Sequence, residues 1–128
     1  MTDQPTIYLC PVDAPVQVLG GKWKLILLFY LLQEPRRNGE LRRLVPTITQ
    51  KMLTQQLREL EDEGLVVRTV FDQVPSKVVY SVAAGEREGL AEVLDVLCRW
   101  GLSWSDKIGA RVLALEPSAT IPEQESAS

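Results

Sequence analysis

The spacing of apolar residues along the chain predicts a protein built mostly from helices. Residues 22–33 contain the run LILLFYLL, which is apolar on every side and therefore predicts a buried central helix. A shorter helix is expected before it, over residues 13–19, with Asp13 as its N-terminal cap and a pair of glycines at its end. Pro35 prevents the central helix from continuing.

Two more helices are predicted directly after this proline. Asn38 is suited to cap a short helix over residues 39–44. Thr49 is suited to cap a longer helix over residues 50–63, which Gly64 would end. The apolar positions of the longer helix recur at helical spacing and share one face: Leu53, Leu57 and Leu60.

The opposite face of the helix predicted over residues 50–63 is polar. At about 100° per residue, the side chains that point away from the leucines are Lys51, Thr54, Gln55 and Arg58. Such side chains suit base edges and phosphates, and two short helices joined by a tight turn indicate a helix-turn-helix. We assign these four residues to the major groove, with Gln50 at its edge and Thr49 as both cap and phosphate contact. The alternative is an ordinary solvated helix surface.

A hairpin and a long helix follow. Residues 65–71 and 77–82 are rich in β-branched side chains and predict two strands, with Lys77 near the tip of their hairpin. Lys77 is a candidate for a phosphate or minor-groove contact, and the alternative is an exposed lysine. A helix-turn-helix followed by such a hairpin is typical of a winged helix.

The long helix, predicted over residues 86–108, has an apolar face wider than one small domain usually covers, which predicts a partner helix and a homodimer. The residues expected in that interface are Leu90, Leu94, Leu97, Trp104 and Ile108. The predicted fold is mainly α with a small β-hairpin: a winged helix-turn-helix with dimerisation helices at both ends. We expect an extended arm at residues 1–12, the domain at residues 13–110, and a disordered tail at residues 116–128.

Charge supports the same interpretation. The chain has a net charge of −3, yet residues 36–58 hold six basic residues against one acidic residue, Glu40. DNA binding depends on the local patch that meets phosphate rather than on net charge. Four arginines lie in the first part of this segment: Arg36, Arg37, Arg42 and Arg43. We expect two of them to reach phosphate, and the other two to pair with Glu40 or with the acidic residues of segment 59–63.

Other functions are less well supported by the composition. The chain has no histidine, which removes the commonest general base and metal ligand and closes the usual catalytic routes without excluding an enzyme. Because the sequence shows no catalytic constellation and no CxxC pair, we expect neither an enzyme nor a metal or other cofactor. No apolar run has membrane-spanning length and no signal peptide is visible, which predicts a cytoplasmic protein without membrane contact. Cys10 is either a redox sensor or a small residue that packs the arm, and Cys98 is expected in the core.

Several short motifs occur in an order that resembles the HxlR-type transcriptional regulators, a branch of the MarR-like winged-helix proteins. They are CPV at 10–12, GGKW at 20–23, PRR at 35–37, GELR at 39–42, KMLTQ at 51–55, LRELE at 57–61 and GLV at 64–66. The resemblance implies a homodimer that binds double-stranded DNA at a pseudo-palindromic operator, with control by a small-molecule effector or an oxidant in some members. The alternative function is a winged-helix module that binds other proteins and reads no DNA sequence.

Overall fold

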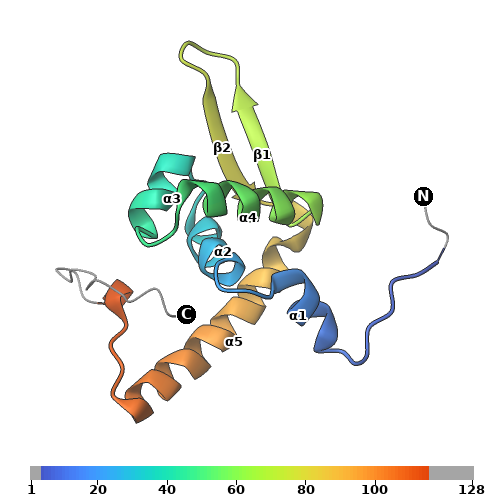
Figure 1. Ribbon diagram of the computed structural model, residues 1–128, viewed down its shortest axis with the longest axis vertical. Helices are drawn as coiled ribbons and strands as arrows, with labels where there is room; N and C mark the ends of the chain where they lie inside the picture. Colours follow the sequence, from blue (N-terminus) through green and yellow to red (C-terminus); the bar gives the residue numbers. More distant parts are fainter. Residues whose placement is uncertain (1–3, 116–128) are drawn as a thin grey trace. The chain divides into compact units, whose positions relative to one another are not determined.

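The computed structural model describes residues 4–115, which form two compact units that meet between Ala91 and Glu92. The elements are α1 (Asp13–Leu19), α2 (Lys24–Gln33), α3 (Asn38–Leu44), α4 (Gln50–Asp62), β1 (Val66–Phe71), β2 (Lys77–Val82), α5 (Ala84–Ile108) and the short 3₁₀ helix η1 (Leu113–Leu115) (Figure 1). The first unit holds everything up to the first turns of α5. The second holds the remainder of α5 and η1.

Helix α2 is the central element of the first unit, as its apolar sequence predicts. Leu27, Leu28 and Leu31 are fully buried, and α2 contacts α3, α4 and β2. The helix begins two residues later than predicted, because the turn before it extends as far as Trp23. Lys24 is consequently the first residue of α2, and it is buried at the edge of the core.

Capping agrees with the sequence at one of three predicted positions. Thr49 caps α4 as expected, because its Oγ1 accepts a hydrogen bond of 3.1 Å from the backbone N of Met52. Asn38 is instead the first residue of α3, whose start is satisfied by the Glu40 carboxylate accepting from the backbone N of Arg37 at 2.8 Å. Asp13 likewise lies inside α1, and its carboxylate accepts from the backbone N of Leu9.

The remaining features of α4 follow the pattern of its side chains. Leu53, Leu57 and Leu60 are all buried, which confirms the predicted inner face. The helix ends at Asp62, and Gly64 adopts a φ of 79°, a left-handed conformation that glycine tolerates best.

The predicted hairpin is present, and its strand β2 forms an additional isolated bridge with a residue outside the hairpin. Strands β1 and β2 pair antiparallel in a register that runs from Val66↔Val82 to Phe71↔Lys77, and the hairpin extends away from the helices of its unit (Figure 1). Arg36 and Tyr80 also exchange two backbone hydrogen bonds, of 2.9 and 2.8 Å, on the other side of β2. The segment that leads into α3 is therefore joined to the base of the wing.

The second unit is dominated by α5. This helix begins at Ala84, two residues earlier than predicted, and continues without interruption through Gly101. The Trp100 and Trp104 rings stack, with centroids 5.6 Å apart and an interplanar angle of 7°. The tail predicted over residues 116–128 lies outside the described residues.

Among residues 4–115, no single helix is long and apolar enough to span a membrane. One bent pair meets that test together: α1 and α2, which meet at 82°.

Candidate nucleic-acid interface

The outward face of α4 is accessible along its N-terminal half. The side chains that the sequence assigns to DNA there are all exposed: Thr49, Gln50, Lys51, Thr54, Gln55 and Arg58. Gln50 Nε2 donates a hydrogen bond of 3.0 Å to Thr54 Oγ1, so these two side chains already form a pair one helical turn apart. The face combines cations with hydroxyl and amide groups that can both donate and accept.

Gln55 is held by a polar chain that reaches into the core. Its Nε2 donates to Glu59 Oε2 at 2.7 Å, and Glu59 Oε1 forms an ion pair of 2.8 Å with Lys24 Nζ. The Lys24 side chain is only 11% exposed, so the pair anchors α4 to the start of α2. The hydrogen bond from Lys24, followed by that from Gln55, lowers the pKa of Glu59 below its ordinary value of 4.5, so the carboxylate stays ionised at neutral pH.

The sequence alone did not predict these contacts among Lys24, Glu59 and Gln55. Lys24 sits within an otherwise apolar stretch, and Glu59 was assigned to an acidic segment expected to pair with arginines. The sequence signal that was available is the charge of Lys24 itself, since a lysine at the edge of a core helix needs a partner.

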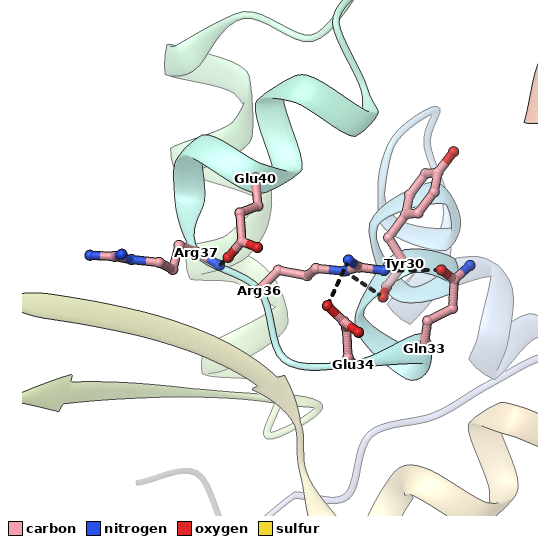
Figure 2. A network of polar contacts seen from close by, with 6 residues as sticks. All are labelled: Tyr30, Gln33, Glu34, Arg36, Arg37 and Glu40. Atoms are coloured by element: carbon pink, nitrogen blue, oxygen red, sulfur yellow. Dashed lines mark hydrogen bonds and ion pairs between the residues drawn. The ribbon is translucent and has the colours of Figure 1, made fainter. Parts of the chain in front are cut away.

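Arg36 and Arg37 are neighbours in sequence but point in opposite directions (Figure 2). The Arg36 guanidinium turns towards the C-terminal end of α2, where Nε donates to the Tyr30 carbonyl oxygen at 3.2 Å. It also donates to Gln33 Oε1 at 3.0 Å and pairs with Glu34 at 3.1 Å. With 13% of its side chain exposed, Arg36 satisfies the Tyr30 carbonyl, which lies at the end of α2 where the helix itself leaves such groups open.

Arg37 instead joins two other predicted cations at a groove between α3 and the wing. Arg37, Arg43 and Lys77 line a cavity of about 710 Å³ together with Glu40 and Phe71. Lys77 Nζ lies 5.3 Å from the centroid of the Phe71 ring, which holds the cation against the hairpin. Arg42 is exposed on α3. The fold thus gathers positive charge from positions 40 residues apart in sequence.

Two of the carboxylates expected to neutralise the arginines, Glu40 and Glu59, have other partners. Glu40 accepts from the backbone of Arg37 rather than from a guanidinium, and Glu59 pairs with Lys24. Arg36 pairs with Glu34, a residue outside the predicted set.

The residues assigned to the dimer interface divide into two groups. Leu90 and Leu94 are buried, at 8% and 6% exposure. Leu97, Trp104 and Ile108 are exposed by 45%, 46% and 58%, so roughly half of each of these large apolar side chains faces solvent.

The two cysteines also differ. Both are free thiols, with Cys10 exposed and Cys98 half-buried, so Cys10 does not pack into the described core and Cys98 is only partly within it.

The arrangement of α3, α4 and the β1–β2 hairpin defines a winged helix-turn-helix protein. The family model for the HxlR-like helix-turn-helix matches residues 18–109. The chain therefore belongs to the HxlR-like helix-turn-helix family of transcriptional regulators, which confirms both the resemblance and the predicted fold class.

Relatives and solved structures agree with this assignment. The chain is 48% identical over 101 residues to the HTH-type transcriptional regulator YtcD of Bacillus subtilis (strain 168), covering 79% of each chain. It is similar to the redox regulator HypR in its oxidised form, with 47% identity, a TM-score of 0.69, and coverage of 73% of this chain and 96% of that one. For reduced HypR the identity is 43%, the TM-score 0.72, and the coverage 78% and 98%. The family and the relatives are transcriptional regulators, not enzymes, and the chain is accordingly a regulator.

Proposed function

We propose that this regulator binds double-stranded DNA as a homodimer, with α4 in the major groove and the wing against the adjoining backbone. The observation that carries the proposal is the composition of the exposed face of α4. Lys51 and Arg58 supply cations there, and Thr54 and Gln55 supply groups that match base edges. A surface for binding other proteins would instead be apolar at its centre, which disfavours the alternative of a protein-interaction module.

Phosphate contacts are assigned to the groove beside the wing. Arg37, Arg43 and Lys77 converge there from separate elements, as an extended polyanion requires. Arg42, exposed on α3, and Thr49 at the start of α4 complete the proposed backbone contacts, and Gln50 is proposed to lie at the edge of the major groove. Arg36 has its guanidinium engaged at the end of α2, so in this proposal it supports the DNA-binding elements without contacting DNA.

A homodimer is supported by the apolar side chains that α5 leaves exposed. Leu97, Trp104 and Ile108 form the proposed contact, whereas Leu90 and Leu94 are already buried and offer little surface for it. Two-fold symmetry of the protein would be matched by a pseudo-palindromic operator with half-sites about one helical turn apart, or a multiple of it. A DNA target implies the cytoplasm as the site of action.

Redox control through Cys10 is a further part of the proposal. It is supported by the exposure of this thiol and by the similarity to HypR, which is described as a redox regulator. Peroxide or diamide should then change the DNA affinity of the wild type but not that of Cys10→Ser. An equal response of both proteins would exclude Cys10 and leave a small-molecule effector as the means of control.

The DNA-binding proposal is tested by recovering genomic fragments bound to the purified protein and sequencing them. A recovered operator should bind with an affinity that falls steeply with salt, and Arg58→Ala should weaken it by about 1–3 kcal/mol. Glu61→Ala, on the same helix, serves as the matched control and should not weaken binding. Failure to enrich any sequence, together with DNA binding that Arg58→Ala leaves unchanged, would favour the protein-interaction module.

A further inference from the structure

The strongest unassigned feature is the polar chain Lys24–Glu59–Gln55, because it constrains a side chain that the proposed function uses. Gln55 is exposed on the outward face of α4, yet its amide is bonded to Glu59 at 2.7 Å. Glu59 in turn is bonded at 2.8 Å to Lys24, whose side chain is almost buried. A side chain fixed in this way loses little freedom when it meets a base.

The chemistry of Glu59 decides which way the Gln55 amide points. An ionised carboxylate can only accept hydrogen bonds, so the amide nitrogen, and not the amide oxygen, must face it. The ion pair with Lys24 keeps that carboxylate charged and in place. Gln55 is therefore left with a carbonyl oxygen and one N–H that remain free for a ligand.

These two free groups match one base edge in the major groove. Adenine presents an amino group at N6 and an acceptor at N7, so it can donate to the Gln55 oxygen and accept from the remaining N–H. Guanine presents two acceptors, O6 and N7, and the fixed amide oxygen would oppose one of them. If the amide could rotate freely, it could turn its nitrogen towards an acceptor of guanine, and the preference for adenine would be weaker.

We propose that Glu59, anchored by Lys24, is a positioning residue that orients the Gln55 amide to read an adenine in the operator. This inference rests on the proposed DNA binding and adds to it a base identity and a residue that acts without touching the DNA. Lys24 has a second role in it, because its cation offsets a carboxylate that would otherwise repel the phosphates near α4.

The experiment measures base preference rather than affinity alone. The position read by Gln55 is first located as the one whose preference is lost in Gln55→Ala, using operators that carry each of the four base pairs at each position. Wild-type protein should prefer adenine there by about 5- to 150-fold. Glu59→Gln keeps the side-chain length but can donate as well as accept, so both amide orientations become available and the preference should fall severalfold.

Two comparisons separate positioning from a general effect on the fold. Glu61→Gln makes the same change of charge on the same helix and should leave the adenine preference at the wild-type value. The double variant Gln55→Ala/Glu59→Gln should show no lower preference than Gln55→Ala alone, because Glu59 acts through Gln55. A purely structural role for Glu59 would instead weaken binding to all four operators equally, together with the melting temperature.

Lys24→Met provides an independent variant if Glu59→Gln does not fold, since it preserves an unbranched side chain and removes only the cation. It should also reduce the adenine preference. The inference is overturned if a specific operator exists but the preferred base is not adenine, or if the folded variants at positions 59 and 24 keep the wild-type preference. If the wild type prefers no sequence at all, the proposed function itself fails, and the two outcomes are therefore distinguishable.

Discussion

Helix α4 and the second half of α5 are both amphipathic, but they use their apolar sides differently. In α4 the apolar residues Leu53, Leu57 and Leu60 are all buried, and apart from Met52 the side chains that face solvent are polar. In α5 the side chains of Trp104 and Ile108 remain about half exposed. The difference indicates that α4 completes the core of its own unit, whereas α5 leaves apolar surface exposed, which supports the proposed dimer contact.

The largest expected effect comes from breaking the α4 side of this comparison. Leu57→Ala removes a side chain that is 1% exposed, and the lost burial and the cavity should lower the free energy of unfolding by about 2–5 kcal/mol. Urea denaturation followed by circular dichroism measures the change. The exposed Met52, replaced by Ala on the same helix, is the control and should cost much less; equal losses would contradict a finished core around α4.

Breaking the α5 side should leave the fold intact and separate the protomers. Trp104→Glu introduces a charge where an apolar contact is proposed, which should weaken dimerisation by about 2 kcal/mol or more. Light scattering at micromolar concentration should show a shift towards monomer. Ser103→Glu, at the preceding exposed position, should leave the dimer unchanged. A monomeric wild type would refute the interface from the outset.

Substitution of the two adjacent arginines should give smaller effects, on stability for Arg36 and on DNA affinity for Arg37. Arg36→Ala removes three side-chain contacts at the end of α2 and should lower the free energy of unfolding by about 1–3 kcal/mol. Arg37→Ala should leave stability nearly unchanged but reduce DNA affinity and the salt dependence of binding by about one phosphate contact. Thermal melts and salt titrations of both variants check this; a loss of stability in Arg37→Ala alone would reverse the assignment.

The smallest expected effect concerns acid. Because the folded state lowers the pKa of Glu59, the stabilisation from the Lys24 pair is complete above the ordinary value of 4.5 and is lost as pH falls through the lowered pKa. The melting temperature of the wild type should therefore fall more steeply with acidification below pH 4.5 than that of Glu59→Gln. Parallel curves for the two proteins would show that the pair contributes nothing to stability.

Local patterns in the sequence were sufficient to predict the helices and strands and to predict which face of α4 is buried. Helical spacing predicts the buried leucines of α4 because side chains three and four residues apart share a face. The cap by Thr49 depends only on residues within one turn, and it is present as predicted. The hairpin follows from its β-branched strands, and its observed bounds differ from the predicted ones by a single residue at the start of β1.

Contacts between distant segments were decided only by the tertiary structure. The bridge between Arg36 and Tyr80 involves a single residue on each side, so no run of strand-forming residues around Arg36 predicts it. The direction of the Arg36 side chain depends on the open carbonyl group of Tyr30 at the end of α2, which is left open only because the helix stops there.

The partners of the polar side chains on α4 were likewise decided by the tertiary structure. The sequence predicts from helical spacing that Gln55 lies on the outward face of α4, and the side chain is exposed there. The sequence did not identify Glu59 and Lys24 as the groups that hold Gln55, because Lys24 and Glu59 lie 35 positions apart and meet only when α2 packs against α4. Periodicity determines which side of a helix is polar, whereas the partner of each polar group depends on how the helices pack.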